Sequence, residues 1–267
     1  MYYPRALPKR ARLNGLEFEY MEKGEGPPLL YLHACEGLDP DEALLEKLSR
    51  HFRVTALAHP GFGLSDLPSS LRTVDDLSYF YLDYLDANNL KDLTVVGSSL
   101  GGWLALEIAS KDCSRIKSLV LDNPIGLRFG DRKARDFVDI FQIPPPDWSK
   151  LFLAGEANDD RDWEAEPEDV ALRAARNREC FTRLGWAPYL HNPQLTSRLH
   201  RVGAPALVLW GDQDKVATRG YAESFAAALP NGTLKVIPDA GHFAFHDQPA
   251  AIAEAVLAFA RQPEAVS

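Results

Sequence analysis

The sequence has few cysteines and no long hydrophobic run, and each shortage restricts what the chain can be. Cys35, Cys113 and Cys180 are too few to pair completely, and their spacing is not that of a metal site. Reduced thiols of this kind are typical of a cytoplasmic protein. No apolar run approaches the roughly 20 residues that cross a bilayer, and the N-terminal stretch has no signal-peptide core. We expect a cytoplasmic protein without a metal or a membrane partner.

An excess of positive charge is also missing. The formal net charge is −9 over 267 residues, whereas a protein that binds nucleic acid normally presents a basic face. Attraction to anionic lipid is equally unsupported. These shortages leave a small molecule as the expected partner, and they say nothing of the oligomeric state.

Hydrophobic residues make up 46% of the chain, enough for a large core. Asn14-Gly15 is a turn signal followed by alternating apolar residues, which predicts a β-hairpin. Further along, short runs that are apolar at nearly every position are typical of parallel strands covered on both faces. The runs are 29–34, 53–58, 93–98, 116–122, 205–211 and 233–238.

Helix-like periodicity with recognisable start signals lies between these runs. Thr73 followed by Asp76 opens one helix, Pro249 starts another, and Asp39-Pro40 begins a third. Strands that alternate with helices predict an α/β protein, with an open, mostly parallel sheet and helices on both faces.

Residues 127–200 break this alternation. The segment has no obvious strand but contains three successive prolines, many aromatic residues and an acidic stretch at 155–169. We interpret it as a helical insertion over the ends of the strands, and the acidic stretch as a solvated loop. The aromatic residues favour an apolar or aromatic substrate.

The sequence Gly97-Ser98-Ser99-Leu100-Gly101 follows an apolar run and precedes a helical one. It fits G-x-S-x-G, a sharp strand-to-helix turn that exposes its central serine as a nucleophile. Serine needs a base to take its proton, and an acid that orients the base. The order after the serine is then acid followed by histidine. Asp212 and Asp214 end one later strand, and His242 follows the next.

Five segments, "HPGFGLSD", "GSSLGGWLALEIA", "LVLDNPIGL", "PALVLWGDQDKV" and "AGHFAFHDQP", together resemble the α/β-hydrolase fold superfamily. This resemblance implies that Ser99 is the nucleophile, His242 the base and Asp214 the acid, with no cofactor. It also implies a core of residues 1–126 and 201–267, with a cap at 127–200. Asp122 is a rival acid, because some relatives carry theirs after that strand, while Asp212 fits loop capping.

Two backbone N–H groups are needed for an oxyanion hole. The resemblance assigns them to Leu100 and Cys35. Relatives commonly have His-Gly where this chain has His33-Ala34. The methyl group of Ala34 disfavours positive φ, and the neighbouring Glu36 carboxylate would oppose an oxyanion if it faced the hole.

The substrate pocket is the least defined part of the predicted site. We expect Ala34, Trp186 and Phe243 to line it. His33, His59 and His246 are interpreted as structural side chains rather than bases. Arg173, Arg176, Arg178 and Arg183 fit a solvated helix face better than a site for a substrate carboxylate.

The expected activity is hydrolysis of a small to medium carboxylic ester through an acyl-enzyme on Ser99. The alternative within the superfamily is a carbon–carbon bond hydrolase of a dioxo acid from aromatic ring fission. Such enzymes usually have a glycine-rich oxyanion loop and a tryptophan after the histidine, whereas this chain has "HACEG" and Phe243. A ligand-binding protein that has lost turnover is the alternative of another class.

Overall fold

The computed structural model describes residues 9–38, 41–130, 135–144, 147–155 and 165–261. Within them, one sheet has the strand order β1-β2-β4-β3-β5-β6-β7-β8. The hairpin β1/β2 and the pair β2/β4 are antiparallel, and all other neighbours are parallel. The strands are β1 (Lys9–Leu13), β2 (Leu16–Lys23), β3 (Pro28–Leu32), β4 (Arg53–Leu57), β5 (Leu93–Ser98), β6 (Ile116–Asp122), β7 (Ala206–Gly211) and β8 (Gly232–Ile237).

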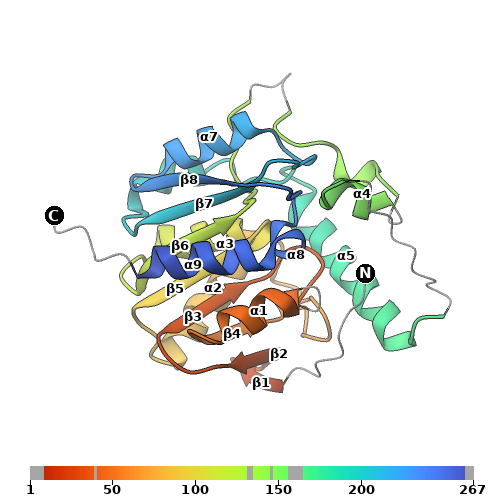
Figure 1. The fold of residues 1–267 in the computed structure, drawn as a ribbon. Helices are drawn as coiled ribbons and strands as arrows, with labels where there is room; N and C mark the ends of the chain where they lie inside the picture. Colours follow the sequence, from red (N-terminus) through yellow and green to blue (C-terminus); the bar gives the residue numbers. More distant parts are fainter. Residues whose placement is uncertain (1–8, 39–40, 131–134, 145–146, 156–164, 262–267) are drawn as a thin grey trace.

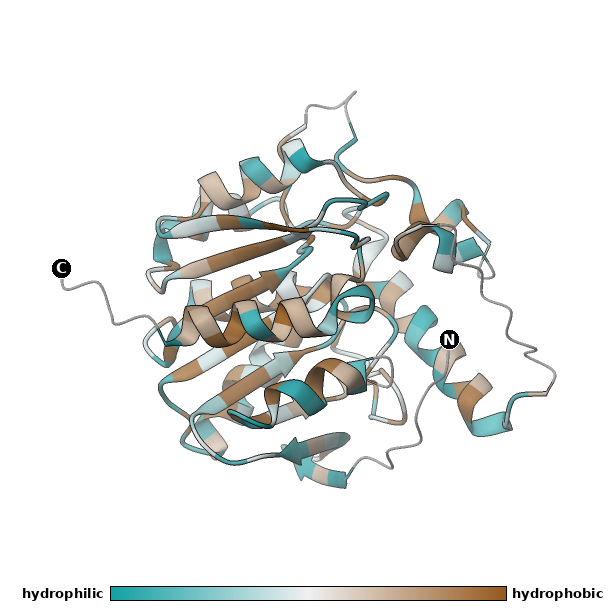
Figure 2. Cartoon of the chain, in the orientation of Figure 1, coloured by the Kyte–Doolittle hydropathy of each residue, from teal (hydrophilic) through white to brown (hydrophobic). Residues whose placement is uncertain are grey.

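Helices cover both faces of this sheet (Figure 1). Helices α2 and α3 pack together on one face, and α1 and α9 pack together on the other. Figure 2 shows that the central strands are hydrophobic along most of their length, as burial on both faces requires. The helices of the sheet layers are α1 (Glu42–Leu48), α2 (Val74–Ala87), α3 (Leu100–Lys111), α7 (Arg219–Ala228), α8 (Ala244–Asp247) and α9 (Pro249–Ala260).

The predicted α/β class, the hairpin and all six apolar strands are confirmed, with bounds shifted by one or two residues at most. Asn14 and Gly15 both adopt positive φ, as a two-residue hairpin turn needs. Thr73 and Asp76 form a reciprocal capping box at the start of α2, and Pro249 is the first residue of α9. The predicted start at Asp39-Pro40 lies outside the described residues, and α1 begins at Glu42.

The segment 127–200 joins β6 to β7 and, in its described part, contains helices and no strand of the sheet. Its helices are η2 (Ile140–Gln142), α4 (Trp148–Phe152), α5 (Glu168–Gly185), α6 (Leu195–Arg198) and the start of η4 (Leu199–Arg201). Figure 1 shows α4 and α5 beyond one end of the sheet, next to α8. Most of the acidic stretch and two of the three prolines lie outside the described residues.

No helix in the described part of the chain combines the length and the apolar character needed to cross a membrane.

Candidate active site

Ser99 lies at the sharp turn between β5 and α3. Its backbone has φ 50° and ψ −109°, a strained conformation that non-glycine residues adopt rarely and mostly at functional sites. A side chain at Gly97 would meet the Gly101 carbonyl oxygen at 2.4 Å, and one at Gly101 would meet the Leu32 carbonyl oxygen at 2.0 Å. The two glycines therefore let the first turn of α3 press against the ends of β5 and β3.

A chain of hydrogen bonds joins Ser99, His242 and Asp214. Ser99 Oγ lies 2.9 Å from His242 Nε2, and His242 Nδ1 lies 2.8 Å from Asp214 Oδ2. All three side chains are buried. The residues follow β5, β8 and β7, and parallel strands bring their carboxyl ends to one edge of the sheet.

Asp214 is held by donors on both carboxylate oxygens. Val216 N–H and Ala217 N–H donate to Oδ1 at 2.7 and 3.1 Å, and Asn123 Nδ2 donates to Oδ2 at 2.7 Å. Asn123 in turn accepts from Gly211 N–H at 3.2 Å and has φ 43°. These donors fix the orientation of the Asp214 carboxylate toward His242.

Asp122, the rival acid, points to a different partner. Its Oδ2 accepts from Ser98 Oγ at 3.3 Å, and Ser98 Oγ lies 3.1 Å from Tyr31 Oη. Burial raises the pKa of Asp122 to about 8, because the ionised form is poorly solvated there. In this arrangement Asp214, and not Asp122, contacts His242. Ser98 is a buried hydrogen-bonding residue, as expected.

The loop after β3 carries the predicted oxyanion donor Cys35. Neither Ala34 nor Cys35 is among the described residues with positive φ, so alanine in place of glycine introduces no strain. Burial raises the pKa of the Cys35 thiol well above its usual value, with Glu36 adding to the effect. The thiol therefore stays protonated, and the residue offers its backbone rather than a thiolate. Leu100 is the first residue of α3, and its N–H has no carbonyl one turn earlier to bind.

Two buried histidines fix the position of this loop. His33 Nε2 accepts from His59 N–H at 2.9 Å, so its Nδ1 carries the proton and donates to the Ala34 carbonyl oxygen at 2.6 Å. The two rings stack with centroids 3.6 Å apart. Burial lowers the pKa of His33 to about 3 and that of His59 well below its usual value, so both remain neutral. They are structural side chains, as expected from the sequence.

The predicted pocket residues lie in different places. Phe243 is buried and stacks on Phe152 of α4 with ring centroids 4.4 Å apart, and the Phe152 ring is 5.7 Å from that of His242. Trp186, at the end of α5, is 57% exposed and lines a cavity of about 450 Å³ with Arg128 and His191. No triad residue lines that cavity. Ala34 is buried in the loop after β3.

The expectation of a solvated arginine face on α5 is wrong for two of the four arginines. Arg173 forms a bidentate ion pair with buried Glu19 at 2.7 and 2.9 Å, and Arg176 donates to the Gly63 and Ser65 carbonyl oxygens at 2.7 Å each. Arg178 lies over the Trp148 ring, 4.6 Å from its centroid. Arg183 is exposed, as expected. The spacing of the arginines along α5 did not reveal that the Glu19 carboxylate and two backbone carbonyl groups of the core face this side of the helix.

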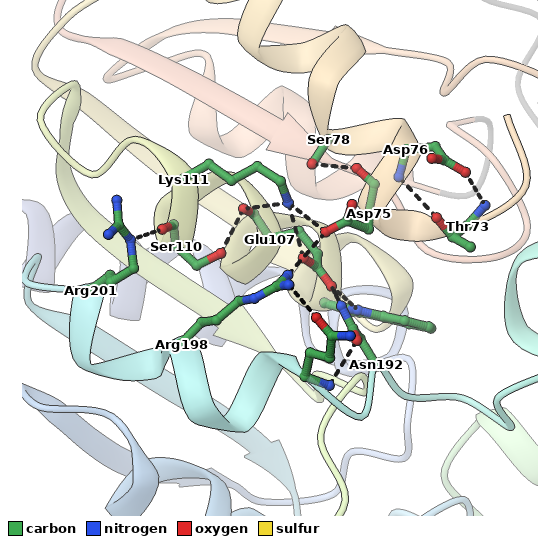
Figure 3. A network of polar contacts seen from close by, with 12 residues as sticks. Thr73, Asp75, Asp76, Ser78, Glu107, Ser110, Lys111, Asn192, Arg198 and Arg201 are labelled. Carbon is green, nitrogen blue, oxygen red and sulfur yellow. Dashed lines mark hydrogen bonds and ion pairs between the residues drawn. The ribbon is translucent and has the colours of Figure 1, made fainter. Parts of the chain in front are cut away.

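Helix α3, which begins after Ser99, is anchored to the end of the inserted segment by a buried carboxylate (Figure 3). Glu107 is fully buried and accepts from Trp103 Nε1 at 3.1 Å and Asn192 Nδ2 at 2.7 Å. Lys111 Nζ lies 3.2 Å from Glu107 and 2.9 Å from Asp75 of α2. The network ties the nucleophile helix to α2 and to the chain that returns from the insertion.

Sequence reasoning missed three side chains at or near this site: Asn123, Phe152 and Asn177. Asn123 follows Asp122 inside the quoted segment "LVLDNPIGL", and its place at a strand terminus was the available signal. Phe152 and Asn177 belong to the insertion, where no motif distinguishes them from other aromatic or polar residues.

Comparison with known proteins agrees with this fold. Residues 29–255 match the model of the alpha/beta hydrolase family, so the chain belongs to that family. The fold is accordingly the α/β-hydrolase fold, and the chain is that of a hydrolase-family protein.

Sequence relatives have varied activities. The chain is 30% identical over 248 residues to the dihydrolipoyllysine-residue acetyltransferase component of the acetoin cleaving system of Cupriavidus necator, covering 87% of this chain and 63% of that protein. It is 25% identical over 258 residues to the 2-hydroxy-6-oxo-6-(2'-aminophenyl)hexa-2,4-dienoic acid hydrolase of Metapseudomonas resinovorans, covering 92% and 88%. The chain therefore spans under two thirds of the first relative's length.

Among solved structures, the chain resembles a serine hydrolase involved in carbazole degradation, with a TM-score of 0.78 and 23% identity over 95% of this chain and 98% of the other. A membrane phospholipase A gives the same TM-score and identity over 96% and 87%. At this identity the likeness supports the fold alone.

Proposed function

We propose that the protein is a serine hydrolase that cleaves a small to medium carboxylic ester through an acyl-enzyme on Ser99. The observation that carries this proposal is the continuous hydrogen-bond chain from Ser99 Oγ through His242 to Asp214. Each member has the geometry its role requires: the base reaches the nucleophile, and the acid reaches the far nitrogen of the base.

In the first step His242 Nε2 takes the proton of Ser99 as Oγ attacks the ester carbonyl carbon. Asp214 stabilises the resulting imidazolium and keeps Nδ1 protonated. The tetrahedral intermediate then expels the alkoxide, which leaves as the alcohol after His242 returns the proton. Water, activated by the same histidine, attacks the acyl-enzyme and releases the acid. No cofactor takes part in this scheme.

The oxyanion of each tetrahedral intermediate would be bound by the N–H groups of Cys35 and Leu100. The close approach of Gly101 to the Leu32 carbonyl supports this assignment, because it brings the first turn of α3 against the start of the Cys35 loop. Preorganised donors of this kind commonly contribute about 10²–10³ in rate.

We assign residues 127–200 as a cap over a core of residues 1–126 and 201–267. Phe152 and Phe243, stacked beside His242, are aromatic neighbours of the triad. They favour an apolar or aromatic acyl group. Trp186 faces another cavity in this structure, so its part in the substrate pocket is the weaker proposal.

The second candidate is hydrolysis of a carbon–carbon bond in a dioxo acid, as the name of the Metapseudomonas relative suggests. A substrate of that class needs a partner for its carboxylate. Arg173 and Arg176 already bind core groups, and Arg183 is exposed. This leaves the partly buried Arg178, beside the Trp148 ring, as the first arginine of α5 to test. Cleavage of such an acid that is lost in Arg178→Ala, without loss of ester hydrolysis, would favour this candidate.

The primary test is hydrolysis of p-nitrophenyl esters of increasing acyl length by the wild type and by Ser99→Ala. We expect turnover in the wild type with an optimum at short to medium acyl chains, and a loss of at least about 10³-fold in the variant. Activity retained in Ser99→Ala would contradict the mechanism. A folded wild type that cleaves neither esters nor dioxo acids would favour the ligand-binding alternative.

A further inference from the structure

One face of α5 is hydrogen-bonded to the core turn, residues 59–66 with the sequence "HPGFGLSD". Arg173, Arg176, Asn177 and Cys180 are spaced i, i+3, i+4 and i+7, so they share one side of the helix. Arg176 binds carbonyl oxygens of the turn, as described above, and Cys180 Sγ lies 3.6 Å from the Pro60 carbonyl oxygen. This turn therefore serves as the attachment point of the inserted helix.

Asn177 reaches beyond the turn to the oxyanion loop. Its Nδ2 donates to the Glu36 carbonyl oxygen at 2.6 Å, and its Oδ1 accepts from Gly63 N–H at 2.6 Å. One backbone partner only accepts and the other only donates, so the orientation of the amide is unambiguous. The side chain is 4% exposed. It links the oxyanion loop, the core turn and α5.

The loop is built to receive this side chain. Gly37, which follows Glu36, has φ +91°, and a side chain there would lie 2.5 Å from Asn177 Nδ2. Only glycine adopts that conformation readily and leaves space for the amide.

The carbonyl groups of Ala34 and Glu36, which lie near the Cys35 N–H in the loop, are bound by different parts of the molecule. His33 binds the Ala34 carbonyl oxygen, which belongs to the same peptide unit as the Cys35 N–H. Because that unit is planar and trans, holding its oxygen also sets the direction of the N–H. Asn177 holds the Glu36 carbonyl oxygen. That oxygen belongs to the same peptide unit as the Gly37 N–H, which donates to the Ala34 carbonyl oxygen at 3.3 Å.

We infer that Asn177 is a positioning residue of the oxyanion hole: through the Glu36 carbonyl it keeps the Cys35 N–H directed at the substrate oxygen. This role rests on the proposed function of Ser99. The inserted segment would then orient part of the active site, in addition to any part it has in covering the substrate.

The test compares Asn177→Ala and Asn177→Asp with Glu179→Ala, a control that removes an exposed side chain from the same helix. Asn177→Asp keeps an acceptor for Gly63 N–H but removes the donor to Glu36. We expect both Asn177 variants to lower kcat for p-nitrophenyl esters by about 10- to 100-fold, with KM changed less than about threefold, because oxyanion contacts act in the transition state. Glu179→Ala should match the wild type.

Hydrogen exchange in peptides covering residues 33–38 gives a second measurement that does not depend on turnover. We expect faster exchange there in both Asn177 variants and unchanged exchange in Glu179→Ala. A lower unfolding midpoint with unchanged kcat would assign Asn177 a purely structural role and overturn the inference. If the wild type hydrolyses no ester, the proposed function fails by itself, and unchanged exchange at 33–38 would then overturn the positioning role as well.

Discussion

The proposed nucleophile half and the proposed oxyanion half of the site are held together in different ways. Ser99, His242 and Asp214 contact one another directly, through their own side chains. The oxyanion half depends on the backbone of residues 34–37, whose carbonyl groups are bound by side chains of His33 and Asn177. The first half is thus bonded within itself, and the second is oriented from outside, by the neighbouring His33 and by Asn177 of the inserted segment.

This difference determines where each half is sensitive to change. Loss of a triad side chain removes a reacting or directly orienting group, so its effect should appear in catalysis while the fold survives. Loss of a group that supports the oxyanion loop should affect both the attachment of α5 and the chemistry. The buried Glu19–Arg173 pair belongs to this supporting set, because it fixes α5 to β2.

The largest effect is expected from the acid of the triad. Asp214→Asn should lower kcat about 10⁴-fold, since the amide no longer enforces the His242 tautomer. Asp122→Asn is the matched control, because it makes the same change at a buried carboxylate that also follows a strand, and it should cost less than about tenfold. Ester hydrolysis by both variants measures this. Equal losses would show that the two carboxylates share the role.

The next effect is on stability. Glu19→Gln leaves Arg173 partly buried without its charged partner, and breaking a buried pair typically costs about 3–5 kcal/mol. Glu17→Gln, two residues away on the same strand, breaks an exposed pair with Arg10 and should cost less than about 1 kcal/mol.

Urea unfolding of the wild type and both glutamine variants gives these free energies. We also expect kcat to fall in Glu19→Gln, because α5 holds the oxyanion loop. Similar stability of the two variants would mean that the Glu19–Arg173 pair does not anchor α5.

The last prediction is a pH dependence of stability that distinguishes Asp122 from the rest. Its pKa is about 8 in the folded protein and 3.8 in the reference state, so between these values the folded state retains a proton that the unfolded state releases. The wild type should therefore lose stability relative to Asp122→Asn as pH rises from about 4 to 8, by at most about 1.4 kcal/mol for each pH unit. Unfolding free energies measured across this range test it. Parallel curves would show that Asp122 is ionised in the folded state.

Sequence reasoning performed best where local pattern and chain order carry the information. The apolar strands were visible because burial on both faces requires continuous apolar runs, and Thr73 and Pro249 mark helix starts by local chemistry. Ser99 was visible because its strained turn needs glycines at fixed positions. The convergence of Ser99, Asp214 and His242 followed from their places after parallel strands.

Arg173 and Arg176 of α5 were misread for the opposite reason. A charged helix surface in a sequence is typical of solvent exposure, and nothing local indicates that Glu19, 154 residues away, faces Arg173. The expected backbone strain at Ala34 is also absent. The loop does not adopt positive φ at that residue and has Gly37 at the position where positive φ occurs.

The sequence by itself determined which runs of the chain are buried, where the chain turns sharply, and which side chains follow the strands. These properties depend on short-range periodicity and steric limits. The sequence favoured Asp214 over Asp122 as the partner of His242, but the hydrogen bond between Asp214 and His242 became visible only in the tertiary structure. The attachment of α5 to the loop after β3 through Asn177 was likewise decided there. Each depends on hydrogen-bond distances of about 3 Å between segments far apart in the chain, and only the packed sheet and its insertion bring those segments together.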